Sequence, residues 1–150
     1  MTKQEYKDIY EVVGAAMEVY NTLGRGMAET IYQEALAVEM EKRGMIAERE
    51  KELCLQYKDV VLKKKYFVDF FYHGIIIELK SVEEINSDHR AQLFNYMRIT
   101  DQHRGILINF GEKFLRAERY LYIPEDDDFV LLMQNNYKEY IIRLIKMVWI

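Results

Sequence analysis

The sequence contains few cysteine, proline and glycine residues. Its 150 residues include one cysteine, Cys54, one proline, Pro124, and seven glycines. A single cysteine excludes an internal disulfide and a cysteine-rich zinc site, and we interpret Cys54 as a small buried residue of a strand. With no low-complexity tract, linker or repeat, the length predicts a single domain over residues 1–150.

The chain also lacks an excess of basic residues and any long apolar run. It has 21 Lys and Arg residues against 25 Asp and Glu residues, a formal net charge of −4. That balance argues against a protein that coats nucleic acid by bulk charge, but leaves open an enzyme that contacts nucleic acid locally. The apolar runs are too short for a bilayer span and the first ten residues are polar. We therefore expect a cytoplasmic, bacterial-type protein with no membrane partner.

Hydrophobic periodicity predicts two helices at the start of the chain, over residues 5–23 and 28–43. Gly24 and Gly26 interrupt the first helix, and Gly44 ends the second. The second helix is expected to bury an apolar stripe, formed by Ile31, Ala35, Leu36 and Met40.

Segments rich in β-branched and aromatic residues predict the next strands, over residues 47–57, 60–65, 66–72 and 75–80. Lys58 and Asp59 predict a hairpin turn, and so do His73 and Gly74. Residues 66–72 and 75–80 are therefore expected to pair antiparallel.

The second half of the chain carries the sequence signals of both helices and strands. We expect a helix over 87–99 capped by Ser87, a buried strand over 105–110, an edge strand over 113–122, and a last helix over 128–147. A helix after a strand meander, followed by a further strand, predicts an α/β fold with helices on the faces of a sheet. The apolar face of the last helix predicts packing on the core or a homodimer contact.

The segment IIIELK, residues 75–80, places an acid and a base on one face of an apolar strand. Side chains alternate along a strand, so Glu78 and Lys80 share a face, and the tight hairpin makes Asp69 a spatial neighbour of Glu78. Burying these charges without a partner is costly, and Mg²⁺ resolves that cost because it prefers oxygen ligands. The lysine could then serve a metal-bound water or a phosphate. An ion pair on a solvated sheet face explains the same residues equally well.

These residues resemble the signature of the PD-(D/E)XK nuclease superfamily, with Asp69 followed by Glu78, Leu79 and Lys80. The segment GMAETIY, residues 26–32, resembles the motif of the GxxExxY family. The segment HRAQLFNY, residues 89–96, resembles another segment of that family and contains the Q-x-x-x-Y element of RecB-like nucleases. The resemblance covers residues 9–111 in the right order, with residues 128–147 as a helical extension.

The resemblance implies a restriction-endonuclease-like fold, a PD-(D/E)XK core with a central mixed β-sheet flanked by helices. It also implies a role for each matching residue. The implied catalytic residues are Asp69, Glu78, Lys80 and Gln92, and the implied metal ligands are Glu29, Asp69, Glu78 and the carbonyl of Leu79. Tyr96 shares a helix face with Gln92 and is implied to help hold the site or the nucleic-acid backbone. Tyr32 is expected to pack between helix and sheet instead.

Other residues are candidates for contacting nucleic acid. His89 lies on the helix face of Gln92, although a helix residue with an ordinary hydrogen bond is the favoured interpretation. Arg90 and Lys65 are candidate backbone contacts, together with Arg25, Lys63 and Lys64. Consecutive lysines on a strand also protect a sheet edge from aggregation, so this cluster has two interpretations.

The favoured hypothesis is a Mg²⁺- or Mn²⁺-dependent nuclease, which hydrolyses phosphodiester bonds with a metal-activated water. Nucleic acid is the expected partner, with DNA as the expected substrate. A catalytically inactive nuclease-fold module for binding or assembly is the alternative, and a small-molecule enzyme is a third hypothesis. Metal binding distinguishes the active nuclease from the inactive module, because a nuclease fold that has lost catalysis need not bind metal.

Overall fold

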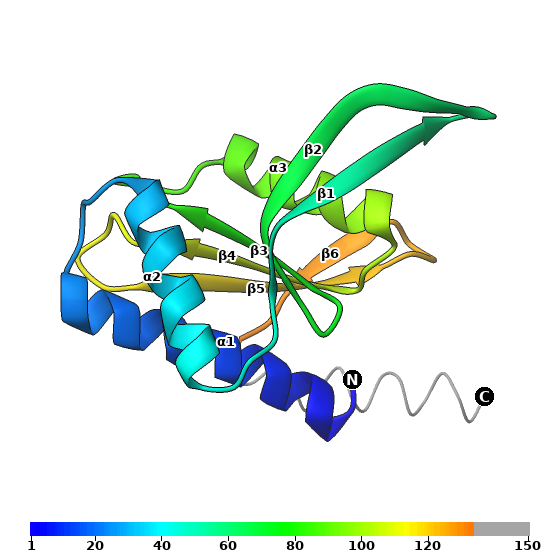
Figure 1. The fold of residues 1–150 in the computed structure, drawn as a ribbon. Helices are drawn as coiled ribbons and strands as arrows, with labels where there is room; N and C mark the ends of the chain where they lie inside the picture. The colour runs from blue at the N-terminus through cyan, green and yellow to red at the C-terminus, as the bar shows by residue number, and fades with distance from the viewer. Residues whose placement is uncertain (134–150) are drawn as a thin grey trace.

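The computed structural model describes residues 1–133, which form three helices and six strands (Figure 1). The elements are α1 (Lys3–Leu23), α2 (Glu29–Lys42), β1 (Glu48–Tyr57), β2 (Val60–Tyr72), β3 (Ile75–Lys80), α3 (Ser87–Thr100), β4 (Arg104–Asn109), β5 (Arg116–Ile123) and β6 (Asp128–Leu131). No helix in this part of the chain is long and apolar enough to cross a membrane.

The six strands form one mixed sheet, and their order in the sheet follows their order in the sequence. Strands β3 and β4 pair parallel, with α3 as the crossover between them, and the other neighbouring strands pair antiparallel. The predicted hairpins are confirmed, including the antiparallel pairing of β2 with β3. The predicted α/β fold with a central mixed sheet is therefore confirmed.

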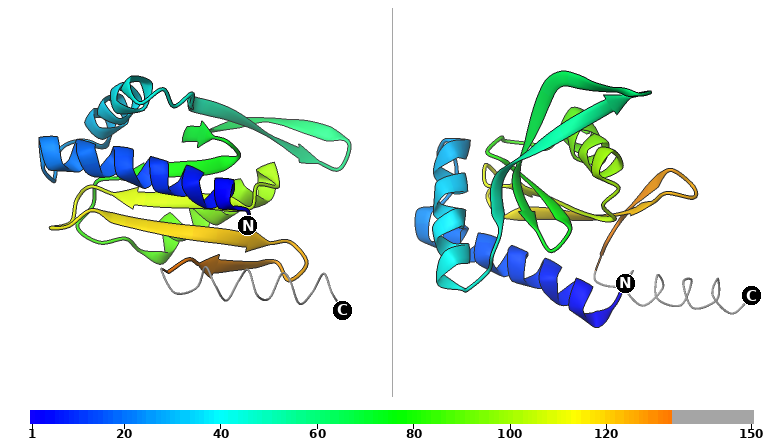
Figure 2. Two further views of the ribbon diagram at one scale, coloured as in Figure 1. Left: turned by 90° about the horizontal axis from the view of Figure 1, so that it is seen from below. Right: turned by 45° about the vertical axis from the view of Figure 1, so that its right-hand side comes forward.

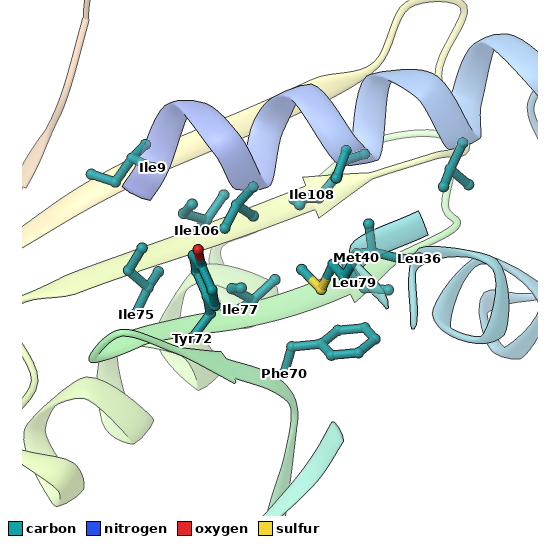
Figure 3. Packing of buried hydrophobic residues seen from close by; sticks show 14 of the residues in the cluster. Ile9, Leu36, Met40, Phe70, Tyr72, Ile75, Ile77, Leu79, Ile106 and Ile108 are labelled. Atoms are coloured by element: carbon teal, nitrogen blue, oxygen red, sulfur yellow. The ribbon is translucent and has the colours of Figure 1, made fainter. Parts of the chain in front are cut away.

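Helices α1 and α2 cover one face of this sheet (Figures 1 and 3). Their apolar side chains pack against β2, β3, β4 and β5, in a core that includes Ile9, Leu36, Met40, Phe70, Ile77, Leu79, Ile106 and Ile108. Tyr32 is fully buried and its ring stacks on Phe110 at 4.3 Å, so the expectation that it packs between helix and sheet is confirmed. Ile31 is exposed, because Tyr32 takes the core-facing side of α2.

Helix α3 packs in a second apolar cluster with residues from β1 to β5, including Leu53, Val68, Ile76, Leu107 and Tyr120. Leu93 and Met97 are its fully buried residues. Alternation along β3 assigns Ile76 to this cluster and Ile75 and Ile77 to the α1–α2 core. Glu78 and Lys80, two and four residues after Ile76, therefore face the α3 side.

Three predicted strand features are wrong. Residues 60–72 form the single strand β2, because β1 pairs with it from Tyr57 to Glu48. The strand predicted over 113–122 begins at Arg116 and lies between β4 and β6, so it is not an edge. Cys54 is exposed, because strand alternation turns it to the face opposite the buried Leu53.

Helix α3 begins with Asn86 as its N-cap, where the sequence suggested Ser87. The Asn86 side chain accepts a hydrogen bond from the His89 N–H at 3.0 Å. The Asn86 N–H donates to His89 Nδ1 at 3.1 Å, which completes a capping box. Ser87 is already the first helical residue, one position past the N-cap.

The helix predicted over 128–147 is wrong at its start. Residues 128–131 form β6, which pairs antiparallel with β5 after a turn at 124–127. Phe129 stacks on Phe94 at 4.1 Å and on Tyr122 at 4.7 Å, and these contacts favour the strand. The rest of the predicted helix, with its proposed dimer contact, lies outside the described residues.

Candidate active site

The carboxylates of Asp69 and Glu78 meet where β2 separates from β3. The backbone ladder between these strands runs from Tyr72 to Phe70. At the next position, carboxylate oxygens accept the backbone N–H groups in place of backbone carbonyls. The Asp69 N–H donates to Glu78 Oε1 at 3.1 Å, and the Leu79 N–H donates to Asp69 Oδ2 at 2.8 Å. The two carboxylates are therefore neighbours, as the hairpin spacing predicted.

Lys80 lies beside this pair and contacts α3. Its Nζ donates to Gln92 Oε1 at 3.2 Å, and Gln92 Nε2 donates to the Tyr96 hydroxyl at 2.9 Å. Gln92 and Tyr96 are one helical turn apart, so one face of α3 presents both residues to the sheet. The structure thus joins the ELK segment and the Q-x-x-x-Y segment through direct hydrogen bonds.

Glu29 approaches the cluster from the N-terminal end of α2. The residue is exposed, but neighbouring atoms partly desolvate its carboxylate, which raises its pKa. The positive charge of Lys80 lowers the pKa of Glu29, and the negative charge of Asp69 raises it. Glu29 therefore lies within electrostatic range of both residues. The residue thus lies near the site, and its role as a metal ligand stays a prediction.

Burial strongly perturbs the two central carboxylates. Desolvation raises the pKa of Glu78 to about 9, and the negative charge of Asp69 adds to the rise. Desolvation also raises the pKa of Asp69, against the opposing effects of the Leu79 N–H and Lys80. Such a buried acidic pair is stable in its charged form only when a cation compensates it.

Gln33 belongs to the site but carries no signal in the motifs. Its Nε2 donates to Asp69 Oδ1 at 3.0 Å, and its Oε1 accepts hydrogen bonds from Arg49 at 3.1 and 3.2 Å. Gln33 is buried and lies four residues after Glu29, on the same face of α2. That spacing is the only sequence signal that could have identified it.

The donor set fits a hard divalent cation. Asp69 and Glu78 offer carboxylate oxygens at a buried position, and carboxylate and carbonyl oxygens are the ligands that Mg²⁺ and Mn²⁺ prefer. Within residues 1–133, no three Asp, Glu, His or Cys side chains form a complete cluster of metal ligands. A cation here would therefore also need main-chain, water or phosphate oxygens, as is usual for Mg²⁺.

Three of the predicted nucleic-acid contacts have partners within the fold. His89 Nδ1 accepts the Asn86 N–H in the α3 capping box. Arg90 makes a two-pronged ion pair with the buried Glu118, at 2.8 and 2.9 Å. Lys65 is exposed on β2 and pairs with Glu52 at 2.8 Å. The structure therefore places His89 and Arg90 in contacts that hold α3, while Lys65 remains at the surface.

Comparison with known proteins identifies the class. A family model described as the PD-(D/E)XK nuclease superfamily matches residues 6–120. That range contains the carboxylate pair, Lys80 and the α3 residues that contact it. The chain belongs to the PD-(D/E)XK nuclease superfamily, and its core is restriction-endonuclease-like.

Comparison with solved structures also finds similar chains. The crystal structure of SSO0001 is similar at 22% sequence identity with a TM-score of 0.49. The similar region covers 60% of this chain and 48% of that chain, so it spans about half of the solved chain. Comparison with curated proteins gives no match.

Proposed function

We propose that this protein is a Mg²⁺- or Mn²⁺-dependent nuclease of the GxxExxY family, which hydrolyses phosphodiester bonds of nucleic acid. The observation that carries the proposal is the pairing of Asp69 with Glu78 through backbone hydrogen bonds, within electrostatic range of Lys80, whose Nζ donates to Gln92. A solvated ion pair explains it less well, because Glu78 is buried and Asp69 is half-buried. DNA is the expected substrate.

Asp69, Glu78 and the Leu79 carbonyl would hold the ion, with Glu29 at the periphery. When bound, such an ion lowers the pKa of a water molecule and neutralises charge on the phosphate. The role of the chain is to keep the two carboxylates in place, since each accepts a backbone N–H from the opposite strand. Gln33 fixes the second oxygen of Asp69.

Lys80 would serve the phosphate or the attacking water. The contact with Gln92 holds its ammonium group beside the carboxylates, and Tyr96 holds the Gln92 amide in turn. A positioned cation stabilises the charge that develops in the transition state more than it stabilises the ground state. Lys80 is therefore proposed to act in cleavage and to contribute little to metal affinity.

A nuclease assay tests this assignment. Single- and double-stranded DNA and RNA are incubated with Mg²⁺ or Mn²⁺ and the wild type, Lys80→Ala or Lys7→Ala, whose exposed lysine on α1 is the matched control. We expect Lys80→Ala to lose cleavage by about 100-fold or more, with Mn²⁺ binding retained in calorimetry. The Lys7→Ala variant should cleave like the wild type.

The alternative, a non-catalytic module, predicts a different result. The wild type would then bind nucleic acid or a partner without cleaving any of the four substrates, and Lys80→Ala would change nothing. Cleavage by Lys80→Ala at the wild-type rate would also contradict the role proposed for this lysine.

A further inference from the structure

Strands β1 and β2 continue beyond the rest of the sheet as a two-stranded arm, defined here as residues 51–67. Strand β3 pairs only with residues 70–72 of β2, so β1 is the one ladder partner of the arm portion of β2. Figures 1 and 2 show the arm extending past the other strands, with α3 alongside it. Leu53 and Tyr66 at its base pack in the second apolar cluster, whereas residues 56–65 are exposed, so core packing does not account for the outer part of the arm.

The arm carries a charge opposite to that of the remaining chain. It contains five lysines, at positions 51, 58, 63, 64 and 65, and two acidic residues, Glu52 and Asp59. The rest of the chain has 16 basic and 23 acidic residues. Lys58 and the three consecutive lysines are exposed. On an acidic protein, such a localised positive region favours a polyanionic ligand.

The two faces of the arm differ. Tyr66 points toward α3, where its ring lies 5.9 Å from the ring of Tyr96. Lys64 shares that inner face, because its Nζ lies 6.0 Å from the Tyr66 ring centroid. Strand alternation places Lys65, which is adjacent to Tyr66 and pairs with the exposed Glu52, on the outer face. The inner face therefore combines an exposed lysine with an aromatic side chain.

A groove of about 670 Å³ lies between the inner face of the arm and α3. Its lining includes Leu55, Tyr66, Gln92, Asn95, Tyr96 and Ile99. Gln92 is at once part of this wall and the hydrogen-bond partner of Lys80. The groove thus leads directly to the candidate active site.

We propose that this groove holds single-stranded nucleic acid and guides it to the active site. The inference rests on the proposed nuclease function and specifies its substrate class. Unpaired bases present flat faces to aromatic side chains such as Tyr66 and edges to amides such as Asn95, while Lys64 neutralises a phosphate. A duplex keeps its bases stacked inside and gains little from an aromatic wall.

Neighbouring lysines on opposite faces provide a matched test. Fluorescence anisotropy of the full chain in EDTA measures binding to a labelled single-stranded DNA, the same sequence as RNA, and the DNA duplex. We expect single strands to bind at least about fivefold more tightly than the duplex. Lys64→Glu should weaken single-strand binding about tenfold, and Lys65→Glu by about twofold at most.

A second variant separates base contacts from charge. Tyr66→Leu keeps an apolar side chain in the cluster and removes the stacking surface, so it should weaken single-strand binding about fivefold or more. Thermal unfolding checks that the variant is folded. Lys64 is exposed, so Lys64→Glu leaves core packing intact and tests the groove proposal even if Tyr66→Leu disturbs packing.

The outcomes distinguish failure of the groove proposal from failure of the proposed nuclease function. Equal losses from Lys65→Glu and Lys64→Glu, tighter binding of the duplex, or no binding of any probe would overturn the groove proposal. Metal-dependent cleavage that persists with those results would leave the nuclease assignment intact. Conversely, the expected binding pattern in a protein that cleaves nothing would support the groove and contradict the nuclease function. The DNA and RNA probes identify which single strand is preferred.

Discussion

At the residue scale, the two central carboxylates have a structural as well as a proposed chemical role. Asp69 and Glu78 accept backbone N–H groups at the point where β2 leaves β3, so the fold depends on their oxygens. The hydrogen bonds require the oxygens but not the negative charge. Burial disfavours that charge and raises the pKa of both carboxyl groups. Variants that retain the oxygen and remove the charge therefore separate the two roles.

Glu78→Gln tests the charge. The amide retains an acceptor for the Asp69 N–H and cannot ionise, so folding near neutral pH no longer requires the uptake of a proton by a buried acid. We expect loss of detectable Mn²⁺ binding and of cleavage, together with a rise of about 2 to 4 °C in the unfolding temperature of the metal-free protein near neutral pH. Calorimetry and thermal unfolding measure these effects. Unchanged Mn²⁺ affinity would show that Glu78 is not a ligand.

Asp69→Ala is the contrasting variant. It leaves the Leu79 N–H and the Gln33 amide without their acceptor, so it should destabilise the fold by about 1 to 3 kcal/mol in spite of the relieved repulsion. Chemical denaturation of the metal-free protein measures this loss against the wild type.

Gln33→Leu tests the residue that no motif identified. We expect Mn²⁺ affinity and cleavage to fall about 10- to 100-fold, because Asp69 loses the hydrogen bond that orients its second oxygen. The control is Glu34→Ala, the adjacent and exposed position on α2. A variant that loses stability while retaining wild-type Mn²⁺ affinity would make Gln33 a purely structural residue.

At the element scale, α3 connects the fold to the site. Leu93 and Met97 bury its core-facing side, while Gln92 and Tyr96 face the candidate site. Its start is held by the Asn86 capping box. Arg90 ties the same helix to β5 through Glu118, whose pKa this ion pair lowers. The orientation of Gln92 toward Lys80 thus depends on how α3 is anchored.

The α3 capping box distinguishes a structural from a catalytic His89. Glutamine also satisfies the third position of a capping box, so His89→Gln should keep cleavage within about threefold of wild type. Asn86→Ala should lower the free energy of unfolding by about 1 kcal/mol. Cleavage rates and chemical denaturation give these values. A large loss of cleavage in a stable His89→Gln variant would return His89 to the active site.

At the scale of the whole molecule, stability depends on pH through the buried acids. Burial raises the pKa of Glu78 to about 9, well above the ordinary value of 4.5. Between these values the folded state binds a proton that the unfolded state does not bind. The free energy of unfolding of the metal-free protein should therefore fall as the pH rises from about 5 to about 9. Asp69 and Glu29 act in the same direction.

Divalent metal should reverse this trend, because it binds the charged carboxylates. We expect Mn²⁺ at about 100 times its dissociation constant to stabilise the wild type by about 2.7 kcal/mol at about pH 8, and much less at about pH 5.5. Thermal unfolding with Mn²⁺ or EDTA at both pH values measures the difference. Glu78→Gln is the control and should lose most of the pH and metal dependence. Equal stabilisation at both pH values would contradict a site made of these acids.

The helices and hairpins were predictable because their signals are local. Helical periodicity predicted α1, α2 and α3 closely, and two short turns predicted the β1–β2 and β2–β3 hairpins. The strand β6 was missed because residues 128–131 carry apolar side chains that suit a helix as well. Pairing with β5 and stacking of Phe129 on Phe94 decided between the two, and neither contact is visible in local spacing.

By itself, the sequence determined that Asp69, Glu78 and Lys80 would gather, because one tight hairpin and the alternation of a strand bring them together. Only the tertiary structure decided which side chains surround them. Gln33 is 36 residues from Asp69 and Arg90 is 28 residues from Glu118 in the chain. The groove beneath the arm likewise exists only because α3 packs beside β1 and β2. Such contacts arise from how helices pack on a sheet, and no short-range pattern encodes the position of one element over another.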